Sequence, residues 1–326
     1  SIDGLQLGDL PSAAAFAEAS AWQVQTFQSL GRHDEARRVG EEGAKVAGQV
    51  LERRPGHMSA IRARALISDS LAGSESDSLH MRKAVALNET GAHDWEAILR
   101  IDPSNQIAWN NLASAQMSGA FAMLRSGRIG EARQQWRAVL AIEQKAKTSA
   151  MIGSALSIPA GALAGLEADL GNRQAAEAAL AEYVRFAEMS GRELPPDSFG
   201  RAAIREFGAF GIGLTAVYAL PVAAGDYLTV RNAAQAALQR GEALKPKDTQ
   251  QELIKNRLLA ATYLVLADAS YNLKDYAAAD REIKLAIDYR RRLPKHTLQD
   301  ERDASDELIL AAMIAARLGR PTEAQQ

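Results

Sequence analysis

The chain has 326 residues, which is too many for one compact core, so we expect either two domains or a repeat array. It carries 38 Lys and Arg against 40 Asp and Glu, and this balance argues against a nucleic-acid partner, which would favour a basic excess on one face. Cysteine is absent, which excludes disulfides, thiolate nucleophiles and cysteine-based metal sites.

The composition favours helices over strands. Hydrophobic residues make up 47% of the chain but aromatic residues only 6%, so much of the apolar fraction is alanine and leucine. Alanine has the highest helix propensity, whereas strands favour β-branched and aromatic residues in alternating patterns. We find no such alternating segment, and the sequence therefore predicts an all-α protein.

A helix–turn–helix junction recurs along the chain. Each copy has an apolar or small residue, a glycine, a few polar residues and then a helix opening rich in alanine and acidic residues. In chain order the copies lie at residues 30–36, around 73–74, at 126–132, 170–176, 225–227, 273–279 (with Lys274 in the glycine position) and 318–324. Glycine just after a helix end accepts the left-handed conformation that closes the last turn. The alanine five positions after the glycine lets the second helix lie close to the first.

The spacing of the junctions predicts stacked helix hairpins. The six intervals between residues 31 and 319 average 48 residues. A period in this range is typical of two-helix repeats that bury their apolar faces against one another. Because a common two-helix repeat has about 34 residues, these helices should be longer, at about 20 residues and about 30 Å each.

Individual segments resemble tetratricopeptide (TPR) motifs. Residues 108–113 resemble the opening of a first TPR helix, residues 101–105 the turn before it, and residues 131–140 the second helix. A second copy covers residues 263–287, where the packing positions of the second helix are occupied by Ala279, Ile283 and Ala286. The resemblance implies an α-solenoid of about seven antiparallel hairpins in a right-handed superhelix. The interval from Trp109 to Ala132 exceeds the family's usual length, which predicts a prolonged first helix.

A second resemblance concerns context. Residues 52–57, followed by a long alanine-rich helix, are similar to the TPR-bearing C-terminal regions of bacterial signalling proteins. Those regions follow a kinase, cyclase or winged-helix domain, often across a membrane span. The resemblance implies an interaction or sensory module, either cytoplasmic or, downstream of a span, periplasmic. Since the chain begins at Ser1 without a leader, we expect a processed protein or a fragment. Its oligomeric state stays open.

Proline and glycine mark the boundaries. Pro195 and Pro196 form the strongest break, which divides the chain into residues 1–194 and 195–326 within one continuous solenoid. Two uncharged stretches, 148–166 and 207–224, are long enough to span a bilayer. Both are rich in small residues, carry a proline and stay in phase with the repeat, so we predict buried helices and no membrane insertion.

We find no arrangement of residues in the sequence that is typical of a catalytic site. The five histidines lack the spacing of metal ligands, although His80 could share a metal with Glu75 or Asp77. The glycines in residues 208–213 lack the preceding strand of a phosphate loop. We therefore predict a non-enzyme with no cofactor and no metal.

The concave side of a helical-repeat stack is formed by its first helices, and repeat proteins generally bind there. Amide and basic side chains on these helices suit a peptide backbone or a terminal carboxylate. The candidate partner-binding residues are Asn110, Asn111, Arg62, Arg64, Arg257 and Tyr263. For Asn111 the alternative is a structural brace against the next repeat. The sequence thus predicts a protein- or peptide-binding scaffold.

The alternative function is a sensor of a small molecule or cell-wall fragment held inside the superhelix. Small-residue helices near residues 161–165 and 208–213 would leave room for such a ligand.

Overall fold

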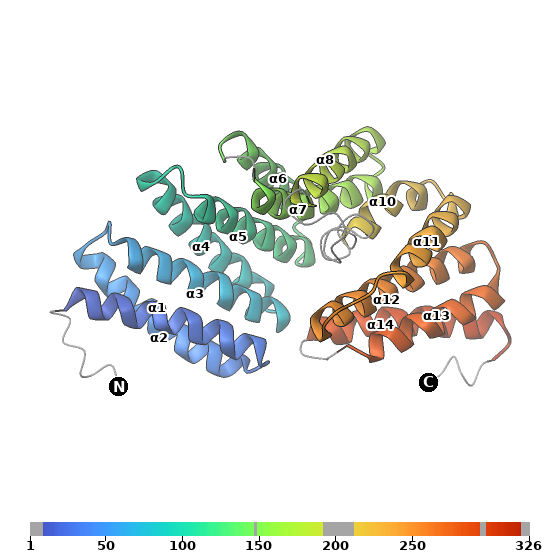
Figure 1. Ribbon diagram of the computed structural model, residues 1–326, viewed down its shortest axis with the longest axis horizontal. Coiled ribbons are helices and arrows are strands. Elements are labelled where there is room, and N and C mark those ends of the chain that lie inside the picture. The colour runs from blue at the N-terminus through green and yellow to red at the C-terminus, as the bar shows by residue number, and fades with distance from the viewer. Residues whose placement is uncertain (1–8, 147–148, 192–211, 294–297, 321–326) are drawn as a thin grey trace. The chain divides into compact units, whose positions relative to one another are not determined.

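The computed structural model describes residues 9–146, 149–191, 212–293 and 298–320 (Figure 1). Within these residues the chain forms 13 α-helices and one short 3-10 helix, with no strand, so the predicted all-α class is confirmed. The α-helices are α1 Leu10–Ser29, α2 His33–Arg53, α3 Met58–Asp77, α4 Met81–Ile101, α5 Gln106–Arg125, α6 Ile129–Leu140, α7 Ala150–Asp169, α8 Arg173–Gly191, α10 Ile212–Ala223, α11 Tyr227–Glu242, α12 Thr249–Asn272, α13 Tyr276–Arg291 and α14 Leu298–Arg317.

The helices group into two compact units that divide between Thr148 and Ser149. The first unit contains α1 to α6, and the second contains α7 to α13 together with α14 from Gln299 onward. The boundary expected between residues 194 and 195 lies outside the described residues, as do the two prolines that suggested it. Inside each unit, consecutive helices pack against each other (Figure 1).

In the described residues the same turn follows α1, α3, α5, α7, α10, α12 and α14. In each turn one residue adopts a positive φ, and its amide donates to the carbonyl three residues earlier. The next amide donates to the carbonyl five residues earlier; Gly127 N to Leu124 O is 3.0 Å and Arg128 N to Met123 O is 2.9 Å. This pair of bonds is the Schellman motif, which satisfies the last carbonyls of a helix. The positive-φ residues are Gly31, Leu79, Gly127, Gly171, Gly225, Lys274 and Gly319.

The junction predicted around Gly73 is wrong. Helix α3 continues through Gly73, and the turn lies at Leu79, which has a φ of 61°. Gly73 serves close packing instead, because a Cβ atom there would lie 3.0 Å from the amide nitrogen of Gln28 on α1. The corrected turns at Gly31, Leu79 and Gly127 are 48 residues apart in both intervals.

The predicted helix length of about 20 residues is confirmed for α1 to α5, whereas α6 is shorter, with 12 residues. Helices α1, α3 and α5 have 20 residues each, and α2 and α4 have 21. The first helix of a hairpin is the more buried one, since it contacts neighbours on both sides: α3 packs against α1, α2, α4 and α5. The second helix keeps one face in solvent, which explains its stronger amphipathic pattern.

The predicted close-contact position is also confirmed. The residue five positions after the positive-φ residue is at most 1% exposed wherever it is described: Ala36, Ala84, Ala132, Ala176, Val230 and Ala279. These small side chains bring the second helix against the first directly after each turn. The packing positions expected on α13, at Ala279, Ile283 and Ala286, are buried as well.

Among the described residues one helix, α7, is long and apolar enough to cross a membrane on length and composition. In its most apolar window 67% of the residues are buried inside the protein, as a core helix requires. The predicted buried helix over residues 148–166 therefore agrees with the packing of α7. Of the second stretch, residues 207–211 lie outside the described residues.

The turn at Lys274, where the positive-φ residue is not glycine, tests this account of the turn. Lys274 has a φ of 65° and an exposed side chain, so replacing it with glycine removes left-handed strain and few contacts. We expect Lys274→Gly to raise the free energy of unfolding by about 0.5–1 kcal/mol, measured by chemical denaturation. The reverse change, Gly127→Lys, should lower it by a similar amount, because a Cβ there meets no atom within 4 Å and only the φ of +79° is unfavourable. A loss of stability in Lys274→Gly would contradict this account of the turn.

Candidate partner-binding site

The residues predicted to bind a partner are divided between the two units. Arg62 and Arg64 lie on α3 and Asn110 and Asn111 on α5, all in the first unit. Arg257 and Tyr263 lie on α12 in the second. None of these six residues lines either of the two cavities described below.

The two arginines of α3 hold neighbouring helices. Arg64 forms a two-point ion pair with Asp94 of α4, with Nε–Oδ2 and Nη2–Oδ1 distances of 2.7 and 2.6 Å. The Asp94 side chain is only 1% exposed, so this guanidinium is committed to an interior carboxylate. Arg62 pairs with Glu18 of α1 and keeps 55% of its side chain exposed. Arg64 is therefore a bridge between α3 and α4, and only Arg62 offers an accessible charge.

Among the other predicted residues, the two asparagines contact each other and Tyr263 contacts the neighbouring helices. Asn110 and Asn111 are half-buried, and the Asn110 amide lies 3.5 Å from Asn111 Oδ1. The Tyr263 hydroxyl donates to Glu242 Oε1 at 2.7 Å, and its ring stacks on Tyr289 with centroids 5.7 Å apart. Burial, aided by the bond to Glu242, raises the pKa of Tyr263 well above its usual value, so the phenol stays neutral. Arg257 is exposed.

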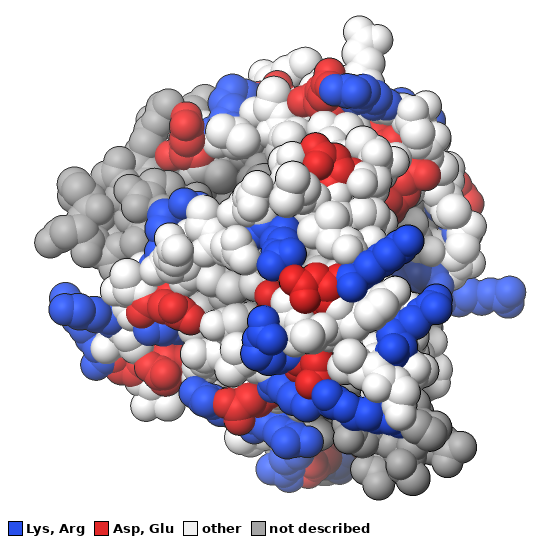
Figure 2. All heavy atoms as spheres, turned by 90° about the vertical axis from the view of Figure 1, so that its right-hand side faces the viewer, with Lys and Arg blue, Asp and Glu red and all other residues white. Residues whose placement is uncertain are grey.

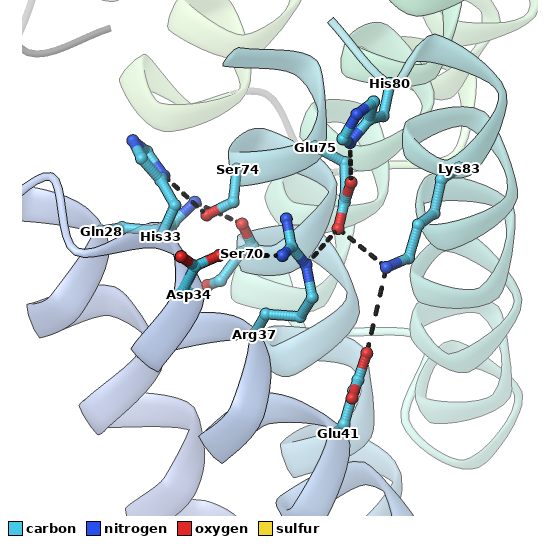
Figure 3. Close-up of polar contacts among 10 residues, drawn as sticks. All are labelled: Gln28, His33, Asp34, Arg37, Glu41, Ser70, Ser74, Glu75, His80 and Lys83. Atoms are coloured by element: carbon cyan, nitrogen blue, oxygen red, sulfur yellow. Dashed lines mark hydrogen bonds and ion pairs between the residues drawn. The ribbon is translucent and has the colours of Figure 1, made fainter. Parts of the chain in front are cut away.

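A polar cluster at the end of α3 is built as a structural joint (Figure 3). Arg37 of α2 and Lys83 of α4 reach Glu75 Oε1 at 2.9 and 2.8 Å, and His80 Nδ1 lies 2.8 Å from Oε2. Burial alone would raise the pKa of Glu75, but the bonds from Lys83, Arg37 and His80 outweigh it and lower the pKa to about 2. The cluster thus ties three helices together around one ionised carboxylate.

The same cluster bears on whether His80 and Glu75 could bind a metal together. The imidazole bonds Glu75 directly, and the carboxylate is already surrounded by two further cations. Across the described parts of the chain, no group of three or more metal-ligating side chains occurs.

The larger cavity belongs to the second unit and has a volume of about 550 Å³. This volume lies in the range of about 300–1,000 Å³ that is usual for ligand sites. Its lining comes from five helices, α7, α10, α11, α12 and α14: Gly165, Asp169, Tyr218, Ala219, Val222, Val230, Leu264, Val265, Asp268, Tyr271, Asn272, Asp306, Ile309, Leu310 and Met313. Most of these side chains are apolar.

Local packing explains the hollow. Gly165 on α7 contributes no side chain, and a Cβ atom added there would meet nothing within 4 Å. Leu310 and Ile314 of α14 pack into a core with α12 and α13, which turns Ile309 and Met313 away from that core. These two side chains are 59% and 45% exposed. A small residue on one wall and an unpacked helix face on another leave the space open.

The polar groups of this cavity are acidic. Asp169, Asp268 and Asp306 line it, and among the lining residues that the structure describes there is no lysine or arginine. Burial raises the pKa of the Asp268 carboxyl, while the Asn272 amide, which donates to Oδ1 at 3.2 Å, opposes that rise. A nearby cation is Arg317, whose Nε lies 3.4 Å from the Tyr271 hydroxyl.

A second cavity, of about 180 Å³, lies among α4, α5 and α6 of the first unit. It is below the usual size of a ligand site. Its lining combines small and polar residues: Asn88, Glu89, Ala92, His93, Glu96, Ala115, Gln116, Gly119, Met123 and Gln135. We regard it as a packing gap between helices.

The surface charges do not separate by sign on the face drawn in Figure 2, which is the side of Figure 1 on which α11 to α14 lie. Basic and acidic side chains alternate across it. Ion pairs also form along α13, where Lys284 pairs with Asp280 at 2.9 Å and Arg292 with Asp288. This face shows the charge pattern of a solvated helical surface.

Sequence reasoning located one wall of the large cavity and missed the rest. Gly165 belongs to the small-residue stretch that was expected to leave room for a ligand. Asp268, Tyr271 and Asp306 carried no signal, because ordinary helix residues become a site only when α12 and α14 are brought together. The glycines of residues 208–211 lie outside the described residues.

Comparisons with known proteins give little guidance on family. No protein-family model matches the chain. No curated protein matches it either. Among solved structures, it is similar to BtubC (BKLC) from P. vanneervenii with a TM-score of 0.46 and 16% sequence identity, over 75% of this chain and 87% of that one. At this level the likeness carries no argument about function, and the TPR assignment stays a prediction.

Proposed function

We propose that the chain is a non-catalytic TPR-like α-solenoid that binds a protein segment, and that the cavity beside Gly165 is its principal site. The seven equivalent turns and the packing of neighbouring helices support a right-handed superhelix of hairpins. The observation that carries the binding role is the open, apolar cavity of about 550 Å³ in the second unit. The signalling context implied by the sequence stays a prediction.

The apolar rim favours a protein segment over a small ligand. Ile309, Met313 and Val222 line the cavity and are 59%, 45% and 36% exposed. Exposed apolar side chains grouped around a hollow are typical of surfaces that bind another protein. A segment with side chains both inside and around the hollow would cover this rim, whereas a buried small molecule would leave it in water.

A sensor of a small molecule is the second candidate, and the volume of the cavity favours it. A ligand enclosed by α7, α10 and α12 would bind the native state alone and so raise the melting temperature. The two candidates therefore differ in what occupies the cavity and share its location.

The test is a selection of random phage-displayed peptides on the full chain, followed by affinity measurements on two matched variants. Gly165→Leu fills the cavity, while Gly48→Leu on α2 adds the same side chain outside it. A Cβ atom at either glycine meets nothing within 4 Å, so both variants should fold. Leucine also has a better helix propensity than glycine, which favours both variants equally.

We expect the selected peptides to lose at least about tenfold in affinity for Gly165→Leu and to bind Gly48→Leu like the parent chain. Peptides that bind all three proteins equally would refute the site. Failure to select any peptide, together with thermal stabilisation by metabolites that Gly165→Leu abolishes, would establish the sensor instead.

A further inference from the structure

The charges around the large cavity determine which segments it can accept. Three carboxyl groups face an otherwise apolar hollow: Asp169 at the end of α7, Asp268 on α12 and Asp306 on α14. Within the described parts of the chain, no ion pair involves any of these three. The Asp268 carboxyl accepts from Asn272 of its own helix, at 3.2 Å. The cavity therefore carries negative charge that no described lysine or arginine pairs with.

Helix ends add to this field. The lining includes Asp169 and Asn272, which are the last residues of α7 and α12, and Val222, which is next to last in α10. A helix C-terminus carries partial negative charge, equivalent to about half an elementary charge. The repeated hairpin turn explains the arrangement, because successive first helices of a stack end at the same edge. Three helix C-termini and three carboxyl groups thus surround one apolar space.

From this geometry we infer that the cavity takes a protein segment in which lysine or arginine stands beside apolar residues; the inference rests on the proposed function. The stem of a lysine or arginine packs on apolar walls such as Leu264 and Val265 while its charged end reaches a carboxylate. Acidic or phosphorylated segments would be repelled by the same groups.

The described basic group near this site does not remove the preference for segments with lysine or arginine. Arg317 lies beside Tyr271, with Nε 3.4 Å from its hydroxyl, and does not line the cavity. Asp268 and Asp306 form no ion pair with it in the described residues. A cation from a partner would therefore meet carboxylates that no described lysine or arginine holds.

The test uses three amphipathic model peptides of equal length, built from leucine with lysine, glutamine or glutamate. Binding to the full chain is measured by titration calorimetry. We expect the Leu/Lys peptide to bind at least about tenfold more tightly than the Leu/Gln peptide, and the Leu/Glu peptide to bind least. The preference should shrink as salt rises from about 0.05 to about 0.5 M, because part of the rim is exposed.

Variants that remove negative charge test whether the cavity carboxylates cause the preference for the Leu/Lys peptide. In the double variant Asp268→Asn with Asp306→Asn, the Leu/Lys peptide should lose most of its advantage over the Leu/Gln peptide, since only Asp169 and the helix ends remain negative. The control is Glu252→Gln, which removes an exposed carboxylate from the same helix α12 outside the cavity. It should leave the preference unchanged. The Asn at position 268 keeps the oxygen that accepts from Asn272, which favours intact folding.

The remaining outcomes separate the inference from the proposed function. Equal binding of the Leu/Lys and Leu/Gln peptides, lost in Gly165→Leu, would overturn the inference and leave the function standing. A lysine preference of undiminished size in the double variant would also overturn it. Binding of all peptides that is insensitive to Gly165→Leu would refute the proposed site itself. If spermine bound as tightly as the Leu/Lys peptide, the ligand would be a free polyamine and the inferred protein segment would be wrong.

Discussion

Replacing Gly153 with leucine is expected to lower the free energy of unfolding by more than about 3 kcal/mol, and Gly153→Ala by about 2 kcal/mol. A Cβ atom at this position of α7 would lie 2.8 Å from the backbone nitrogen of Ser190 and 2.9 Å from the carbonyl oxygen of Phe186, both on α8. Backbone atoms cannot rotate away as a side chain can, so the two helices must separate. Separation also exposes Phe186, which is fully buried.

The matched control is Gly165, on the same helix, where an added Cβ atom meets nothing within 4 Å. Gly165→Ala should raise the free energy of unfolding by about 0.5–1 kcal/mol, because alanine has the better helix propensity. Chemical denaturation of both alanine variants measures the contrast. Equal effects at the two positions would show that α7 and α8 are not in backbone contact at Gly153.

The second large effect is expected at Glu75. Glu75→Gln should lower the free energy of unfolding by about 2–4 kcal/mol at neutral pH, because it leaves Arg37 and Lys83 without the carboxylate that they share. The Glu75 side chain is 2% exposed, whereas that of Lys83 is 49% exposed, so solvent screens part of the attraction. For this reason we expect the lower half of that range. The comparison is Glu131→Gln, where an exposed pair with Arg128 is lost and stability should hardly change.

The pH dependence of the free energy of unfolding measures the Glu75 cluster independently. The folded-state pKa of Glu75 is about 2, which is below that of an unfolded glutamate. The unfolded chain therefore binds the proton first, and the stabilisation is complete above about pH 4.5 and declines as the pH falls toward 2. Glu75→Gln should lose this part of the acid dependence. A parallel decline in the variant and the parent chain would show that Glu75 does not titrate as the cluster requires.

The predictable part of this fold is the part set by local chemistry. Turns at Gly31, Gly127, Gly171, Gly225 and Gly319 follow from a glycine after an apolar helix end, and Lys274 was placed by the sequence around it. The turn at Leu79 could not be read in this way, because a leucine at positive φ has no local signature. Its conformation is imposed by the packing of α3 against α4.

The candidate site depends on contacts that no local pattern encodes. Arg64 was expected to be available for a partner, but the carboxylate of Asp94 lies 30 residues later and binds two of its three guanidinium nitrogens. Asp169, Asp268 and Asp306 meet around one cavity although they come from three separate helices. Hydrophobic periodicity indicates which face of a helix is buried, but it does not indicate which neighbour that face will meet.

The repeated turn also bears on how the chain folds and how it opens. In the described residues, the substantial contacts join helices that lie close along the chain, and the most widely separated of these pairs is α7 with α10. Such low contact order favours fast folding, which can begin at any hairpin and spread to its neighbours. It also limits cooperativity, so amide hydrogen exchange should fall into steps, with each hairpin exchanging according to the number of neighbours that cover it.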